Sequence, residues 1–130
     1  FVFLFFFSIS EVDFGIRILL TSIVFLVIEY LAKMLTKETR PDFKTNKEKS
    51  LIGKFEEKHS FPSGHCGYIA LLTTMLNLHY HNVLLTSLFT AITISVGFSR
   101  IYTKRHYFND VVGGYVVGIT LGILSFLIFP

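Results

Sequence analysis

Long stretches without charge constrain this chain more than any other feature of its sequence. The hydrocarbon core of a bilayer requires about 20 apolar residues in a helix. In lipid, backbone polar groups find no water, and a helix satisfies them within its own segment. We therefore expect an all-α fold, a multi-pass transmembrane helical bundle. The segments that can span are residues 16–35, 62–80, 83–98, which is slightly short, and 111–129.

A further apolar run opens the chain at residues 1–9, and we interpret it as the tail of an earlier helix. The chain begins at Phe1 rather than at a methionine, and no basic segment precedes the run as it would in a signal peptide. We expect one membrane-embedded domain over residues 1–130, with four to five helices and with one or more N-terminal helices missing. The single cysteine, Cys66, excludes an intrachain disulfide.

The distribution of charge follows from this topology. Residues 36–61 form a charged linker, which we expect to be an extramembrane loop. If successive spans alternate in direction, the linker, the turn that follows Ser99 and the start of the last span reach the same side of the membrane. Among the lysines and arginines, nearly all then lie on this side, and Arg17 is the lone exception. The charged clusters are therefore expected at one end of the bundle, at one depth.

The most charged turn is SRIYTKRHYFND, residues 99–110, between two apolar segments. His106 and Asp110 are four residues apart, so they share one face of a helix that begins near His106. The carboxylate can then accept the proton of one imidazole nitrogen and leave the other as a nucleophile or base. The alternative is a surface pair that caps the helix, with Asn109 or Asp110 as the N-cap.

The sequence FPSGH, residues 61–65, marks the beginning of the second span. Pro62 suits the first turn of a helix, Ser63 offers a hydroxyl group, and Gly64 allows a ligand to approach the backbone closely. Free N–H groups at a helix start favour phosphate, and His65 can donate a proton to a leaving oxygen there. The alternative is an ordinary interfacial turn with a solvated histidine.

Three cations accompany these two motifs. Lys33 supplies a point charge, and Arg40 and Arg100 supply planar guanidinium groups that match phosphate oxygens. The alternative for each residue is that it only anchors a helix end at the membrane surface, with its charged group directed toward water. Glu29 lies four residues before Lys33, so we expect the two to pair within the span. The chain lacks a convincing set of metal ligands, and we expect no metal and no other cofactor.

In combination, these motifs resemble the three-part signature of the type 2 phosphatidic acid phosphatase family, which shares its site with bacterial acid phosphatases and vanadium haloperoxidases. Every signature position is present and in order, from Lys33 toward the C-terminus. Phe108 replaces a proline often seen in the family, and Arg105 is an unusual neighbour for the histidine, which puts substrate preference in question. The three parts read Lys33-x6-Arg40-Pro41, Pro62-Ser63-Gly64-His65 and Ser99-Arg100-x5-His106-x3-Asp110.

The resemblance implies metal-independent hydrolysis of a phosphate monoester or pyrophosphate on a membrane lipid, through a phosphohistidine. It implies that His106 is the nucleophile, that Asp110 orients it, and that His65 protonates the leaving oxygen and later activates water. It also implies that this chain is a fragment of a six-helix core. The alternatives are a phosphotransferase on the same fold and a non-catalytic membrane subunit. The phosphate-binding residues implied are Lys33, Arg40, Ser63, Gly64 and Arg100.

The expected partner is a membrane lipid, because the site opens at headgroup depth in a chain without a soluble part. Candidates are a phospholipid such as phosphatidic acid or phosphatidylglycerol phosphate, a polyprenyl diphosphate, and a lipid A phosphate; nucleic acid is not expected. The resemblance places the site on the periplasmic side of a bacterial inner membrane. The enrichment of basic residues on cytoplasmic loops would, by itself, turn this side inward. Two interpretations stay open for the basic residues within 44–58: they attract anionic headgroups, or they belong to a solvated linker.

Small residues recur in the last span at Gly114, Gly118 and Gly122. Such a stripe allows two helices to approach closely. We expect it to pack inside the bundle, with a homodimer face as the weaker alternative.

Overall fold

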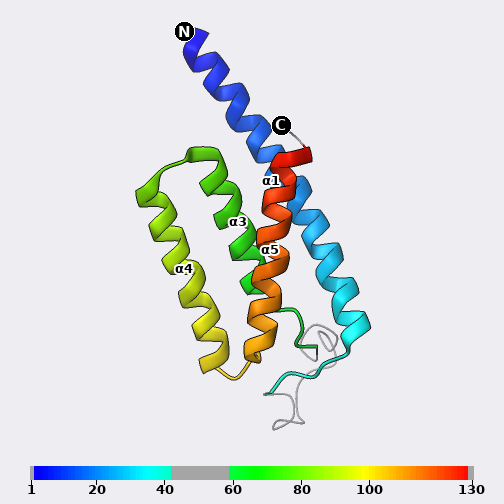
Figure 1. Ribbon diagram of the computed structural model, residues 1–130. Coiled ribbons are helices and arrows are strands. Elements are labelled where there is room, and N and C mark those ends of the chain that lie inside the picture. The colour runs from blue at the N-terminus through cyan, green and yellow to red at the C-terminus, as the bar shows by residue number, and fades with distance from the viewer. Residues whose placement is uncertain (1, 42–58, 129–130) are drawn as a thin grey trace.

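The computed structural model describes residues 2–41 and 59–128, and it is all-helical apart from an isolated β-bridge between Thr39 and His59. Within these described residues, three stretches are long and apolar enough to cross a membrane: the Ser10–Thr36 part of α1, together with α4 and α5. The prediction of an all-α, multi-pass bundle is confirmed. The helices over the described residues are α1 (Val2–Thr36), α3 (Gly64–Tyr80), α4 (Val83–Tyr102) and α5 (Phe108–Ile128) (Figure 1).

Helix α3 lies at the centre of the bundle, with α4 on one side and with α5 and α1 on the other (Figure 1). Its most extensive contact is with α5, and the glycine stripe of α5 makes that contact close. A Cβ atom on Gly118 would lie 2.9 Å from the backbone nitrogen of Leu71, and one on Gly122 would lie 2.8 Å from Cβ of Thr74. The stripe is therefore a packing surface inside the bundle, as expected.

The alternative of a homodimer face through this stripe is wrong. Gly114, Gly118 and Gly122 are all buried, and their neighbours belong to α3 or to the residue before it. Gly114, for example, faces the backbone of Ser63 and of Gly67. A surface already covered by a helix of the same chain is not available to a second copy.

Three expected boundaries differ from the structure. Residues 2–9 continue into the first span as one helix, α1, so their interpretation as the tail of an earlier helix is wrong. No proline interrupts α1, and its polar residues near Glu11 are compatible with a helix. Helix α4 continues to Tyr102, so this span is not short. Helix α3 begins at Gly64 with Ser63 as the N-cap, so Pro62 precedes the helix rather than lying in its first turn.

A small apolar core holds the helices together, and the outer faces of the bundle are apolar as well. The core cluster comprises Phe14 and Phe25 of α1 with Leu71 and Met75 of α3. Many large apolar side chains on the outside are exposed, which suits a bundle surrounded by lipid. Only a narrow strip of side chains on each helix is therefore buried against the other helices.

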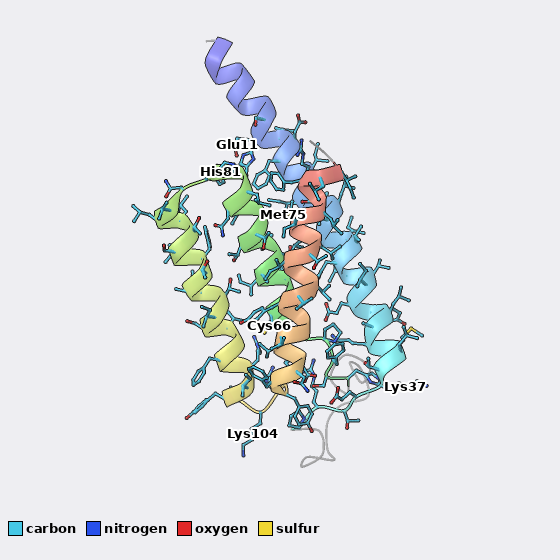
Figure 2. All side chains as sticks on the ribbon, in the orientation of Figure 1. Glu11, Lys37, Cys66, Met75, His81 and Lys104 are labelled. Atoms are coloured by element: carbon cyan, nitrogen blue, oxygen red, sulfur yellow. The ribbon has the colours of Figure 1, made fainter. Side chains whose placement is uncertain are left out.

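The two ends of the bundle differ in character. The C-terminal ends of α1 and α4 and the N-terminal ends of α3 and α5 lie together at one end (Figure 1). Figure 2 places Lys37 and Lys104 at this end, and Glu11 and His81 at the other. The described charged clusters therefore share one side, as the alternating topology predicted. Residues 44–58, whose basic side chains were considered for headgroup binding, lie outside the described residues.

Candidate active site

A cavity of about 460 Å³ lies at the charged end of the bundle. It collects side chains from α1, from the N-terminal end of α3, from the C-terminal end of α4 and from the turn before α5. Most of the residues predicted from the three motifs meet here, although they come from distant parts of the sequence. The lining residues are Phe25, Leu26, Glu29, Lys33, Arg40, Gly64, His65, Tyr68, Ile69, Val96, Arg100 and His106.

The first motif supplies two of the cations. Lys33 lies in the last turn of α1 and is buried, and its Nζ lies 2.5 Å from Oε1 of Glu29. The predicted pairing of these residues is thus confirmed, and it follows from their i, i+4 spacing on one helix. Arg40 lies beyond the helix end, where its Nε donates a hydrogen bond of 3.2 Å to the carbonyl of His59. The segment before FPSGH therefore helps to hold the arginine at the cavity.

The FPSGH segment and the serine before it are fixed on two sides by backbone hydrogen bonds. On the α1 side, the N–H of Ser60 donates to the carbonyl of Glu38 at 2.7 Å. On the α5 side, the N–H of Ser63 donates to the carbonyl of Asp110 at 2.9 Å. Ser63 is buried, whereas His65 is exposed toward the cavity that it lines. The first turn of α3 is thereby held between the ends of α1 and α5.

His106 and Asp110 are adjacent in the structure, and both are buried. Nδ1 of His106 lies 3.5 Å from Oδ2 of Asp110. The expectation that both residues lie on one helix is wrong, because α5 begins at Phe108 and His106 precedes it. The turn instead brings the imidazole over the first turn of the helix, and the carboxylate faces its Nδ1 side.

The capping alternative is correct in part. Oδ2 of Asp110 accepts a hydrogen bond of 2.7 Å from the N–H of Tyr107, the residue just before α5. An acidic side chain in the third helical position often reaches back to that N–H group. Asp110 is thus in the first turn rather than at the N-cap, and Asn109 is not the N-cap either. The carboxylate combines this helix-start contact with its contact to His106.

Ser60 is a site residue that the motifs in the sequence do not indicate. Its hydroxyl donates a short hydrogen bond to Oδ2 of Asp110, and both side chains are fully buried. Ser60 immediately precedes FPSGH, but no helical spacing connects it with Asp110. Its role could not be recognised before the two segments were placed side by side.

Arg100 completes the cationic lining from the end of α4. Its carbonyl accepts hydrogen bonds from the N–H groups of Arg105, at 3.1 Å, and of His106, at 3.3 Å. The turn that carries the histidine is therefore folded back onto the arginine. Among the described residues, Nε of Arg100 has no hydrogen-bond partner. This guanidinium group thus retains a donor for an anion in the cavity.

The arrangement favours an anion over a metal ion. Lys33, Arg40 and Arg100 place three positive charges around the cavity, and the start of α3 adds partial positive charge at Gly64. Within residues 2–41 and 59–128, no group of three or more His, Cys, Asp or Glu side chains can hold a metal. Two histidines at the edge of such a cavity suit nucleophilic attack and proton transfer at a bound phosphoryl group.

Comparison with protein families agrees with this arrangement. The model of the PAP2 superfamily matches residues 14–130. The chain belongs to the PAP2 superfamily. The resemblance recognised in the three motifs is thereby confirmed, and the motifs lie within the matched residues.

Two relatives within this superfamily come from Bacillus subtilis. Undecaprenyl-diphosphatase BcrC of strain 168 is 36% identical over 108 residues, which are 82% of this chain and 53% of that protein. The chain thus spans about half the length of this curated relative. A crystal structure described as the first transmembrane PAP2 type phosphatidylglycerolphosphate phosphatase matches with a TM-score of 0.73 and 25% identity. That match covers 98% of this chain and 68% of the solved one.

Proposed function

We propose that this chain carries the catalytic part of a membrane lipid phosphatase, which hydrolyses a phosphate monoester or pyrophosphate through a phosphohistidine. The observation that supports it best is the convergence of His65 and His106 with three cations on one cavity. The cavity lies at the end of helices that are apolar enough to span a membrane. Substrate therefore meets the site at the depth of lipid headgroups.

In the first step, Nε2 of His106 attacks phosphorus, and the bond from phosphorus to the leaving oxygen breaks. Asp110, on the Nδ1 side of the ring, orients the imidazole and stabilises the positive charge that develops there. His65 donates a proton to the leaving oxygen, so the lipid departs as a neutral alcohol or as a monophosphate. In the second step, His65 takes a proton from water, which attacks phosphorus; the P–N bond breaks and inorganic phosphate is released.

The cations act on the charge of the transition state. Phosphoryl transfer spreads negative charge over three equatorial oxygens, and fixed donors stabilise that charge without reorganising. We propose that these oxygens are bound by Lys33, Arg40 and Arg100, by the hydroxyl of Ser63, and by the backbone N–H of Gly64 at the start of α3. Three cations can supply the electrostatic stabilisation that other phosphatases obtain from metal ions. We therefore propose that the reaction does not require a metal.

The proposed substrate is a lipid phosphate or diphosphate. The names of the two relatives specify an undecaprenyl diphosphate and a phosphatidylglycerol phosphate, which share a phosphorylated headgroup on a long apolar chain. A cavity at the end of a membrane bundle suits this class. We propose these two substrates first, and phosphatidic acid and a lipid A phosphate as further candidates.

Phosphate release from the purified chain tests the proposed reaction. We expect release from undecaprenyl diphosphate or phosphatidylglycerol phosphate in detergent micelles, undiminished by excess chelator. His106→Ala and Asp110→Ala should lose it, whereas His81→Ala, at the other end of the bundle, should retain it. Full activity in His106→Ala would remove the nucleophile, and loss of activity on chelation would contradict the metal-free route. A wild-type chain inactive on every lipid phosphate would favour a non-catalytic subunit.

We further propose that the site faces the periplasm, or the exterior of the cell, rather than the cytoplasm. This orientation is supported by the resemblance to a family whose sites commonly face outward. Lys104 is exposed at the charged end and His81 at the other, so cysteines at these two positions form a matched pair. A membrane-impermeant maleimide applied to intact cells should label Lys104→Cys and not His81→Cys. The reverse labelling would place the site inside.

A further inference from the structure

Glu29 is the acidic member of an otherwise cationic lining. Among the described residues around the cavity, it alone carries a carboxylate. Its side chain is only 12% exposed, and its Oε1 lies 2.5 Å from Nζ of Lys33. Burial of a charge requires a partner, and the lysine provides one. The remaining question is why a pocket suited to phosphate contains a negative charge.

The carboxylate also lies against the start of α3. A Cβ atom on Gly64 would lie 2.5 Å from the carboxyl carbon of Glu29 and 2.7 Å from its Oε2. The space that the glycine leaves open is therefore used by a side chain from α1. Free N–H groups at a helix start attract anions, and Gly64 is the first residue of α3.

Glu29 thus makes the two contacts that the proposed mechanism assigns to phosphoryl oxygens. It pairs with the lysine of the first motif, and it contacts the glycine of the second. A phosphoryl group that reaches Lys33 and Gly64 meets this carboxylate, and two negative charges in one place repel each other. Either the carboxylate moves away from Lys33, or the anion is held less tightly.

We propose that the Glu29 carboxylate competes with the phosphoryl group for Lys33 and the start of α3, and thereby weakens the affinity of the site for phosphate. This inference rests on the function proposed above. This competition affects turnover. Inorganic phosphate, the product of the second step, dissociates from the three cations more readily than it would without the carboxylate. Glu29 is accordingly a determinant of affinity rather than a catalytic residue.

A different role for Glu29 makes the opposite prediction. If the carboxylate serves only to hold Lys33 in position, its removal misplaces the ammonium group, and phosphate binds more weakly. If it competes, its removal leaves Lys33 to the phosphate, and phosphate binds more tightly. The sign of the change in phosphate affinity therefore separates competition from positioning.

The decisive variant is Glu29→Gln, which keeps the shape of the side chain and removes its charge. The full chain in detergent is titrated with inorganic phosphate, and its thermal stabilisation gives an apparent Kd that does not depend on turnover. We expect this Kd to fall roughly tenfold, and the inhibition constant of phosphate in the lipid phosphatase assay to fall with it. Glu11→Gln is the matched control, because it removes the same charge from α1 at the opposite end of the bundle.

Each outcome of this experiment either supports or refutes competition between Glu29 and phosphate. Glu29→Asp, whose shorter side chain draws the carboxylate back from Gly64, should give a smaller tightening in the same direction. An unchanged or higher Kd in Glu29→Gln, with an active wild-type chain, overturns this inference alone. If neither variant folds, Glu29 is a structural element and the competition is refuted. A wild-type chain that neither releases phosphate nor is stabilised by it contradicts the proposed function and this inference together.

Discussion

Ser60 and Asp110 are 50 residues apart in the sequence, yet their side chains are joined by a short hydrogen bond with no exposure to solvent. The bond connects the segment before α3 to the first turn of α5. Oδ2 of Asp110 accepts this hydroxyl and the N–H of Tyr107, and the same oxygen faces the ring of His106. The carboxylate that orients the proposed nucleophile is therefore itself held by donors from two segments.

The first prediction concerns this support. In Ser60→Ala, Asp110 loses a buried donor, and a hydrogen bond to a charged group contributes ~1.5–3 kcal/mol. If that contribution holds His106 in its reactive orientation, kcat falls by roughly ten- to a hundredfold. KM should change little, because Ser60 does not line the cavity. Steady-state kinetics on a lipid phosphate would measure the separation of kcat from KM.

Two further variants distinguish positioning from general destabilisation. Ser60→Thr retains a hydroxyl and should recover most of the lost activity. Ser87→Ala removes a hydroxyl that bonds within α4, to the carbonyl of Val83, and should leave kcat unchanged. Equal kcat in Ser60→Ala and the wild-type chain would show that the remaining contacts of Asp110 suffice.

The second prediction compares Arg100, in the last turn of α4, with Arg105, in the turn that follows. Arg100 lines the cavity, whereas Arg105 is exposed. Removal of one preorganised donor to a transition-state oxygen typically lowers kcat by ~10²–10³-fold. Arg100→Ala should show a loss of that order, and Arg105→Ala should not. Arg100→Lys should recover only part of it, because an ammonium group does not reproduce the planar fork of a guanidinium group.

A comparable loss in Arg105→Ala would contradict this assignment. It would indicate that the net positive charge of the turn matters rather than one guanidinium group. Repeating the assay at high salt would then show whether the effect is long-range, because salt screens exposed charges.

Much of the fold could be predicted from the sequence because lipid imposes strict requirements. Apolar length located α1, α4 and α5, and alternation of direction placed the charged motifs at one end. The segment predicted as a span over residues 62–80 forms α3, a helix of 17 residues that, among the described helices, is not long enough to count as a candidate span. The exact helix ends could not be predicted in the same way. Helix α5 begins at Phe108 because Asp110 caps the N–H of Tyr107, and that contact cannot be seen in hydropathy. Residues 2–9 extend α1, since nothing in their sequence breaks a helix.

The contacts of the site could be predicted from the sequence only where both residues lie close together on one helix. The pairing of Glu29 with Lys33 followed from their positions on one helix. The approach of Glu29 to Gly64, and of Ser60 to Asp110, joins segments whose relative placement depends on how α1, α3 and α5 pack. The motifs named the charged and histidine side chains that line the cavity, apart from Glu29. They did not indicate which neighbouring residues hold these side chains in place or compete with their ligand.

The third prediction tests the packing that brings α3 and α5 together. A Cβ on Gly118 would lie 2.9 Å from the carbonyl carbon of Gly67 and from the nitrogen of Leu71, both backbone atoms that cannot rotate away. Overpacking of this kind typically costs ~1–3 kcal/mol. Gly118→Ala should therefore lower the melting temperature of the chain in detergent. It should also lower activity, because α3 and α5 carry His65 and Asp110.

Gly15→Ala is the matched control for this change. Gly15 lies within α1, and a Cβ there would meet nothing within 4 Å. Alanine is the better helix former by ~0.5–1 kcal/mol, so this variant should melt at the same temperature or somewhat higher. The same methyl group thus has opposite effects on two helices, and the difference measures the close approach of α3 and α5. Equal melting temperatures for the two variants would mean that α3 and α5 can separate slightly without loss of stability. The glycine stripe would then not be what fixes the distance between His65 on α3 and Asp110 on α5.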